Sequence, residues 1–160
     1  MSRHKSSESI IKKVIIRQGI ISDLPALASM EETIFGEDKF SIQQIKYLLT
    51  KANADFFVME HKGNLIGSAI MVWRKSSKTG RLYSIGIDNI FQGHGLGQAL
   101  LGKCEQSALD RGCHTIVLEV RADNKSAISL YKKYGYRPYR TLAGYYADGM
   151  NGIGMMKKFD

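Results

Sequence analysis

The chain has 160 residues, of which 44% are hydrophobic and 24% are charged, and its formal net charge is +8. These values fit one soluble globular domain with a core of its own. No apolar run approaches the roughly 20 residues that span a bilayer, and the Ser-rich, charged N-terminus lacks the apolar segment of a secretory signal. The positive charge fits a nucleic-acid surface, an ordinary solvated surface, or a cleft that attracts a polyphosphate cofactor or an acidic substrate.

The cysteine content is low. Only Cys104 and Cys113 occur, which is too few for a disulfide framework, and neither has a partner at zinc-binding spacing. We therefore expect a cytoplasmic protein with no bound metal.

The first third of the chain predicts an arm, a strand and two helices. Residues 1–12 are polar and without periodicity, which indicates a disordered basic arm ahead of a domain over residues 13–160. A short strand is expected over residues 14–17. Each helix is predicted to begin at a capping residue, the first at Ser22-Asp23 and the second near Ser41. Apolar residues recur at helical spacing in both: Leu24, Leu27, Ala28 and Ile34, then Ile42, Ile45, Leu48 and Leu49.

The hydrophobic period then changes to that of strands. Segments 56–59, 65–73 and 82–87 are joined by short turns and predict an antiparallel meander. A helix is expected from Leu96 to Gly112, with a buried stripe of Leu96, Leu100, Leu101, Cys104 and Ala108. The remaining elements are a strand over 116–120, a helix ending at Gly135, and a hairpin of strands 136–141 and 152–158.

The element order, β-α-α-β-β-β-α-β-α-β-β, predicts a single α/β (α+β) domain. We expect a mixed central sheet with helices on both faces. A strand–helix–strand unit requires a crossover connection, so strands 82–87 and 116–120 are predicted to lie side by side and parallel.

A glycine-rich turn, Gln92-Gly93-His94-Gly95-Leu96-Gly97, lies between a predicted strand and a predicted helix. The free N–H groups of a helix start, together with glycines that leave no Cβ in the way, form an anion cradle suited to a pyrophosphate. The turn lacks the Lys-Ser/Thr ending of a P-loop, and its third glycine comes one residue early for a dinucleotide fingerprint. By itself, the turn could equally serve close helix packing.

The second half of the chain resembles the GNAT superfamily of N-acetyltransferases. The superfamily pattern Gln/Arg-x-x-Gly-x-Gly/Ala is met by Gln92, Gly95 and Gly97. The stretch Leu118 to Asn124, followed by Ala127-Ile128, Leu130-Tyr131 and Tyr134-Gly135-Tyr136, is similar to the second half of that fold. The segment Tyr145-Tyr146-x-Asp148-Gly149 makes the chain most similar to protein N-terminal acetyltransferases, especially the bacterial ribosomal-protein alanine N-acetyltransferases.

The resemblance implies acetyl-CoA as cofactor and assigns it a site. The backbone of Ile85-Gly86-Ile87 would pair with the pantetheine arm as an added strand, and one N–H would polarise the acetyl carbonyl. The N–H groups from Gly93 to Gln98, including those of His94 and Leu96, would hold the pyrophosphate. Asn124 would contact the pantetheine; it also suits a helix N-cap, and both roles can coexist.

Two side chains are candidates for acid–base chemistry. Glu119 lies in an apolar strand and could accept the proton of the attacking amine, or instead point to solvent or pair with a basic residue. Tyr131 could be a core aromatic residue, but its twelve-residue spacing from Glu119 is similar to that of the acid–base pair in the ribosomal enzymes. The resemblance implies that Tyr131 also contacts the cofactor and protonates the leaving thiolate. Since neither His94 nor Cys104 suits a nucleophile, we expect direct attack in a ternary complex.

The acceptor site is predicted near Tyr145, Tyr146 and Phe40, where a peptide could enter between the last hairpin and the loop at residues 36–41. The tyrosines could instead pack in the hairpin. Two segments differ from the family pattern, Met150-Asn151-Gly152 and Gly36 to Ser41, and they affect the choice of substrate rather than of cofactor.

We expect the acceptor to be a protein or peptide N-terminus, such as that of a ribosomal protein. A small amine such as a polyamine or an aminoglycoside is the main alternative. A non-catalytic acyl-CoA-binding or RNA-binding module is disfavoured by the glycine turn together with Glu119 and Tyr131. No membrane or direct nucleic-acid partner is expected, and the chain is expected to be a monomer or a weakly associating homodimer.

Overall fold

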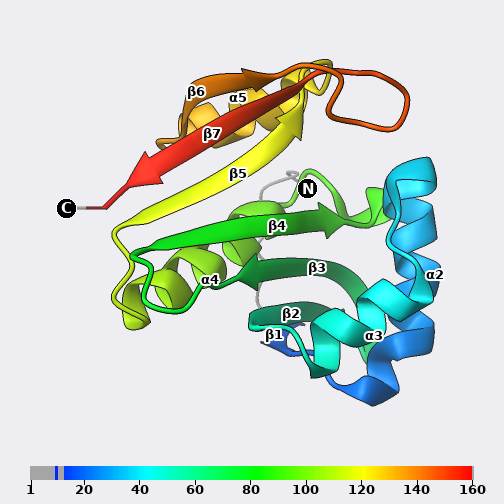
Figure 1. Cartoon of the computed structure of the whole chain (residues 1–160). Coiled ribbons are helices and arrows are strands. Elements are labelled where there is room, and N and C mark those ends of the chain that lie inside the picture. The colour runs from blue at the N-terminus through cyan, green and yellow to red at the C-terminus, as the bar shows by residue number, and fades with distance from the viewer. Residues whose placement is uncertain (1–9, 11–12, 160) are drawn as a thin grey trace, which may run out of the picture.

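The computed structural model describes residue 10 and residues 13–159. Except for Ile10, the predicted arm over residues 1–12 lies outside these residues. The described residues form a seven-stranded mixed sheet with α-helices on both faces (Figure 1). The strand order is β1-β2-β3-β4-β5-β7-β6, with bounds Val14–Gln18 (β1), Ala54–His61 (β2), Asn64–Val72 (β3), Thr79–Ile87 (β4), Thr115–Arg121 (β5), Arg137–Leu142 (β6) and Gly152–Lys158 (β7).

Alternation along the strands divides the core into two layers. In β2, Phe56 and Val58 pack with helices α2 (Leu24–Phe35) and α3 (Ile42–Thr50), whereas Phe57 and Met59 belong to the cluster on the opposite face. That second cluster contains residues of α4 (Leu96–Asp110) and Tyr131 of α5 (Lys125–Lys133). The predicted fold class and the predicted buried stripe of α4 are confirmed.

One predicted detail of the helices is confirmed in position alone, and one is wrong. Asp23 is the N-cap residue of α2, as predicted, but its side chain makes no capping bond to that helix: its carboxylate accepts a hydrogen bond from the Ile20 backbone N–H at 2.8 Å and pairs with Arg17. Ile42 was expected on the apolar face of the second helix, but it is 56% exposed at the first position of α3. Ser41 does cap α3, since its Oγ accepts from the Gln44 N–H.

Strands β4 and β5 are parallel neighbours, as predicted, but only over part of their length. The register pairs Thr79–Leu82 with Thr115–Leu118 and continues no further. Tyr83 is an extra residue in the β3–β4 ladder, because Met71 pairs with Leu82 and Ile70 with Ser84. Such a bulge bends and twists its strand. Beyond it, β4 and β5 separate, as Figure 1 shows, so the prediction that all of residues 82–87 flank β5 is corrected.

The last hairpin also has an arrangement that the element order did not reveal. β7 pairs antiparallel with both β5 and β6, so the final strand lies between them. This places the β6–β7 connection, residues 143–151, at the end of β5 where Arg121 lies.

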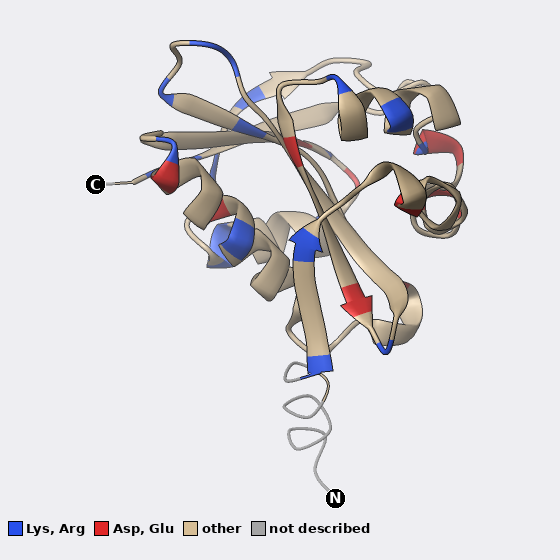
Figure 2. Cartoon of the chain, turned by 90° about the horizontal axis from the view of Figure 1, so that it is seen from below, with Lys and Arg blue, Asp and Glu red and all other residues tan. Residues whose placement is uncertain are grey.

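Charged residues occur over all parts of the fold. Figure 2 shows Lys and Arg positions on helices, strands and loops, interspersed with fewer Asp and Glu positions. No helix of the described residues combines the length and apolar character that crossing a bilayer requires.

Candidate active site

Two cavities meet where β4 and β5 separate. One, of about 330 Å³, is lined by residues from α2, the segment after it, β4, β5 and the β6–β7 connection. The other, of about 460 Å³, lies over the glycine turn. They share four lining residues, Ile85, Asn124, Ala127 and Tyr131. We name them the acceptor-side cavity and the cofactor-side cavity, respectively.

The cofactor-side cavity collects the predicted cofactor-binding residues. Eleven of the twelve line it: Ile85, Gly86, Ile87, Gln92, Gly93, Gly95, Leu96, Gly97, Gln98, Asn124 and Tyr131. His94 is half-buried and is not among the lining residues. The predicted grouping of these segments is therefore present in the fold.

The geometry of the glycine turn suits an anion. Gly93 and Gly95 have φ angles of +84° and +77°, which side chains with a Cβ adopt only with strain. Gly95 is the N-cap of α4, so the free N–H groups and positive dipole end of that helix face the cavity. A Cβ built on Gly97 would meet no atom within 4 Å, which leaves open space in front of the helix start. These features fit the pyrophosphate of a coenzyme A.

The side chain of Gln92 stabilises this turn by hydrogen bonds. Its Nε2 donates hydrogen bonds to the Ile87 carbonyl and to Asn89 Oδ1, each at 3.0 Å. Gln92 therefore links the end of β4 to the turn before α4. It would assist cofactor binding indirectly, by fixing the position of the turn's backbone N–H groups.

The backbone of β4 beyond Leu82 has an open side. β3 covers one edge of this segment, pairing Ala69 with Ile85 and Ser68 with Gly86, while β5 has separated from the other edge. An extended ligand could pair with that edge as a strand does. Gly86 is required in this segment because α2 packs closely against it: a Cβ would lie 2.8 Å from both Ile34 Cγ2 and Phe35 Cζ.

Glu119 lies in the acceptor-side cavity and is paired. Its Oε2 accepts a hydrogen bond from Arg81 Nε at 3.1 Å, and its side chain is 11% exposed. Strand alternation explains the direction it faces: Ile116, Leu118 and Val120 are buried in the core while Glu119 faces the cavity. Glu119 thus pairs with a basic residue, which was one of the alternatives, and it also lines the cavity.

Tyr131 is the aromatic residue at the junction. Its side chain is buried, lines both cavities, and meets the Tyr136 ring edge-on at 5.8 Å. Burial raises the pKa of the Tyr131 hydroxyl well above its ordinary value, so the group remains a proton donor over the neutral range. Tyr131 therefore contributes to the core and to the site at the same time.

The predicted acceptor residues surround the entrance of the acceptor-side cavity. Tyr145 and Tyr146 meet edge-on at 5.1 Å, and the Tyr145 hydroxyl accepts a hydrogen bond from Arg81 Nη2 at 3.1 Å. Burial and the adjacent Tyr145 raise the pKa of Tyr146 to about 12. Phe40 stacks on Tyr83 with ring centroids 5.3 Å apart. All four aromatic side chains line this cavity.

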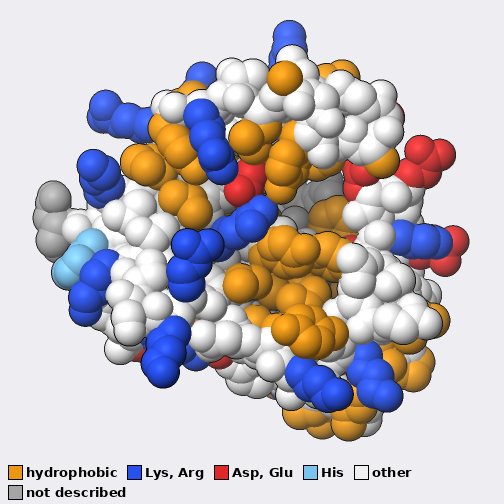
Figure 3. All heavy atoms as spheres, in the orientation of Figure 1, with side chains coloured by type: hydrophobic (Ala, Val, Ile, Leu, Met, Phe, Trp, Pro, Cys, Tyr) orange, Lys and Arg blue, Asp and Glu red, His pale blue; other side chains and the backbone are white. Residues whose placement is uncertain are grey.

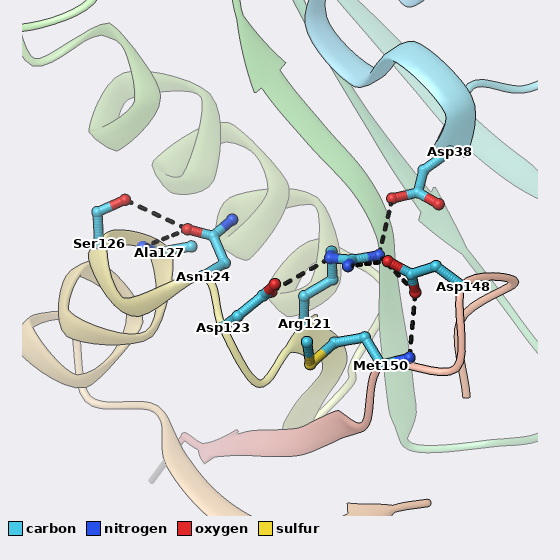
Figure 4. A network of polar contacts seen from close by, with 8 residues as sticks. All are labelled: Asp38, Arg121, Asp123, Asn124, Ser126, Ala127, Asp148 and Met150. Carbon is cyan, nitrogen blue, oxygen red and sulfur yellow. Dashed lines mark hydrogen bonds and ion pairs between the residues drawn. The ribbon is translucent and has the colours of Figure 1, made fainter. Parts of the chain in front are cut away.

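Arg121 joins three segments at the entrance (Figure 4). Its guanidinium pairs with Asp38 after α2, with Asp123 after β5, and with Asp148 of the β6–β7 connection. Hydrogen bonding to Arg121 lowers the pKa of Asp148 below its ordinary range. The same view shows Asn124 Oδ1 accepting from the Ala127 N–H and the Ser126 hydroxyl, which confirms the N-cap role.

Sequence reasoning missed four charged residues of this site: Glu31, Asp38, Arg81 and Arg121. Glu119 is therefore not the sole carboxylate there, because Glu31 and Asp38 also line the cavity. Glu31 is 5% exposed, accepts a hydrogen bond from the Phe40 N–H at 3.0 Å, and has its pKa raised by burial. Arg81 directly precedes the strand predicted over residues 82–87 and Glu31 lies on a predicted helix, so local patterns revealed neither as a site residue.

The remaining reactive groups lie elsewhere. Cys104 and Cys113 are free and buried, and burial raises the pKa of the Cys104 thiol to about 12. Within residues 10 and 13–159, no group of three or more His, Cys, Asp or Glu side chains is arranged to hold a metal ion.

The fold thus offers two adjoining cavities with shared lining residues, an arrangement that suits a group-transfer enzyme. Residues 23–136 match the acetyltransferase (GNAT) family. The chain belongs to this family and is an acetyl-transferring enzyme.

Individual relatives agree with this assignment. An uncharacterized N-acetyltransferase of Methanocaldococcus jannaschii is 32% identical, over 91% of this chain and 92% of its own. An N-alpha-acetyltransferase of Sulfurisphaera tokodaii is 29% identical, over 86% of this chain and 89% of its own. The crystal structure of the ribosomal-protein-S18-alanine N-acetyltransferase of Escherichia coli has a TM-score of 0.83 at 27% identity, covering 92% of this chain and 94% of its own.

Proposed function

We propose that this enzyme transfers the acetyl group of acetyl-CoA to the N-terminal α-amine of a protein or peptide, by direct attack in a ternary complex. The observation that carries the proposal is the junction of the two cavities at Tyr131, with the glycine turn on one side and Glu119 on the other. We expect the reaction to take place in a reducing cytoplasm, where the two free cysteines would persist.

Acetyl-CoA would supply an activated acetyl thioester. The residues of the cofactor-side cavity fit its parts: the N–H groups at the start of α4 would hold the pyrophosphate, and the open edge of β4 would align an extended arm. Holding both reactants in one geometry lowers the barrier by several kcal/mol, because the loss of translational freedom precedes the reaction.

The proton transfers are assigned to Glu119 and Tyr131. Glu119 would accept the proton of the amine, directly or through water, from the acceptor side. The Tyr131 hydroxyl, which remains protonated, would donate a proton at the junction. Arg81 would hold the Glu119 carboxylate in place and also fix the Tyr145 hydroxyl at the entrance.

Three considerations support an α-amine as acceptor. Its ordinary pKa of about 8 lies some two units below that of lysine, so a larger fraction is neutral near pH 7. Four aromatic side chains surround the entrance, which suits a peptide more than a polyamine. A relative named N-alpha-acetyltransferase aligns with 86% of this chain, and a solved ribosomal-protein alanine N-acetyltransferase shares the fold over 92% of it.

The test compares matched acceptors in a coenzyme A-release assay. One peptide carries a free N-terminus; its twin is N-blocked and carries one lysine; a free polyamine is the third acceptor. We expect turnover only of the free N-terminus. Equal turnover of the lysine peptide, or turnover of the polyamine alone, would transfer the assignment to a side-chain or small-molecule amine.

A further inference from the structure

A third hollow adjoins the acceptor-side cavity. It has a volume of about 640 Å³ and lies between α3 and the strands β3 and β4, with Gln43, Tyr47, Asn53 and Trp73 among the residues that line it. We name it the α3 groove. The face of the molecule in Figure 3 is hollowed near its middle, with hydrophobic side chains gathered around the hollow and Lys and Arg side chains along one side.

The α3 groove adjoins the acceptor-side cavity. Phe40, Arg81 and Tyr83 line both. These three side chains form one connected wall, because Phe40 stacks on Tyr83 and the Arg81 guanidinium lies 5.3 Å from the centroid of the Tyr83 ring. A ligand that leaves the acceptor-side cavity past this wall enters the groove.

The lining of the groove suits a polypeptide. Gln43 and Asn53 carry amide groups, which can donate to and accept from the donor and acceptor that each peptide unit presents. Tyr47 is 57% exposed, which offers an uncovered aromatic surface for a side chain. Among the described residues that line the groove, Arg81 is the only charged one, so neutral or acidic side chains fit better than basic ones.

We propose that the α3 groove binds the residues of the acceptor polypeptide that follow its N-terminal residue. This inference rests on the proposed function. An extended chain advances about 3.3–3.6 Å per residue, so the residues next to the acetylated one would pass Arg81 and Tyr83 and the following ones would contact Tyr47 and Gln43. A small amine that fills the acceptor-side cavity alone would make none of these contacts.

The experiment compares a tripeptide with a decapeptide that begins with the same three residues and carries no basic residue. The wild-type enzyme is expected to show a kcat/KM about tenfold higher for the decapeptide, mainly through a lower KM, since added binding away from the reacting atoms is uniform binding. Tyr47→Ser is expected to abolish this gain and to leave the kcat/KM for the tripeptide unchanged, which also shows that the variant is folded.

The matched control is Ile42→Ser. Ile42 is on the same helix and is equally exposed, at 56%, but does not line the groove. It should retain the full gain from peptide length.

Equal kcat/KM for the two peptides in the wild-type enzyme would overturn the proposed role of the groove in peptide binding, while the proposed function would still hold. Loss of the gain in Ile42→Ser as well as in Tyr47→Ser would also overturn it. If neither peptide is acetylated while a polyamine is, the proposed function fails and the groove assignment fails with it.

Discussion

The guanidinium of Arg81 lies between the carboxylate of Glu119, 3.1 Å from its Nε, and the hydroxyl of Tyr145, 3.1 Å from its Nη2. The last paired residues before the two strands separate are Leu82 and Leu118; Arg81 on β4 comes one residue before this pair, and Glu119 on β5 one residue after it. The proposed base is therefore held in place from the neighbouring strand by a residue that also reaches the entrance. Desolvation is the largest single effect and opposes the charge of Arg81, but the interactions with Glu119 and Tyr145 together outweigh it, and the net effect raises the pKa of the guanidinium.

Replacement of Glu119 tests the base. Glu119→Gln keeps the shape of the side chain and an oxygen for Arg81, but it removes the proton acceptor, so kcat should fall by about 10²–10⁴-fold. The matched control is Glu60→Gln, because Glu60 is also a strand carboxylate bonded to an arginine Nε, that of Arg17. Steady-state kinetics of both variants decide the matter; a Glu119→Gln enzyme with wild-type turnover would leave Glu119 a purely structural partner of Arg81.

Replacement of Tyr131 tests the acid. Tyr131→Phe should lower kcat by about 10²–10⁴-fold with little change in KM, because the hydroxyl is proposed to act only as the leaving group departs. Tyr136→Phe is the control: Tyr136 is also buried and touches Tyr131, but its hydroxyl donates to Glu105 and it lines neither cavity. A similar loss of kcat in both variants would attribute the effect to core packing.

Replacement of Gly95 tests the cofactor cradle. At a φ of +77° an alanine is strained by about 1–2 kcal/mol, so Gly95→Ala should lose some stability whatever it binds. Gly63→Ala, at φ +81° in the β2–β3 turn with open space around a Cβ, carries the same strain away from the cavities. Calorimetry with coenzyme A should show about tenfold weaker binding for Gly95→Ala only. Unchanged affinity in both folded variants contradicts the assignment.

The buried carboxylate of Glu31 predicts a pH dependence of stability. Burial raises its pKa in the folded state, so the wild-type protein gains stability as the pH falls through that value toward the unfolded pKa of about 4.3. Glu31→Gln keeps an acceptor for the Phe40 N–H but cannot titrate.

Urea denaturation of both proteins at pH 7 and pH 4 measures the difference. At pH 7 we expect Glu31→Gln to be at least as stable as wild type, and on acidification wild type should gain relative to it. Glu31→Ala leaves the Phe40 N–H without its acceptor and should be about 1–3 kcal/mol less stable than Glu31→Gln at either pH. A pH-independent difference between wild type and Glu31→Gln would contradict the raised pKa.

Much of the architecture followed from local patterns. Leu96, Leu100, Leu101, Cys104 and Ala108 lie on one face of a helix at 3.6 residues per turn, and all five are buried. Alternation along β5 places Leu118 and Glu119 on opposite faces of the strand. The positive φ angles of Gly93 and Gly95 are a property that only glycine adopts readily, so the turn before α4 was visible in the residue types themselves.

The site could be predicted only in part, because it is assembled by contacts between distant segments. The bulge at Tyr83 arises from the register between β3 and β4, and it ends the pairing of β4 with β5 at Leu82. Neither feature changes the hydrophobic pattern of a single strand.

By itself, the sequence determined the order of the elements, the faces they bury and the glycine turn, since these depend on periodicity and backbone sterics within a few residues. The tertiary structure alone decided that Arg81 pairs with Glu119, that Glu31 enters the cavity, that Arg121 joins Asp38 to Asp148, and that the α3 groove adjoins the site. Contacts of this kind depend on where whole strands and helices are placed relative to one another, and side chains 27 to 83 residues apart share no local pattern that would reveal them.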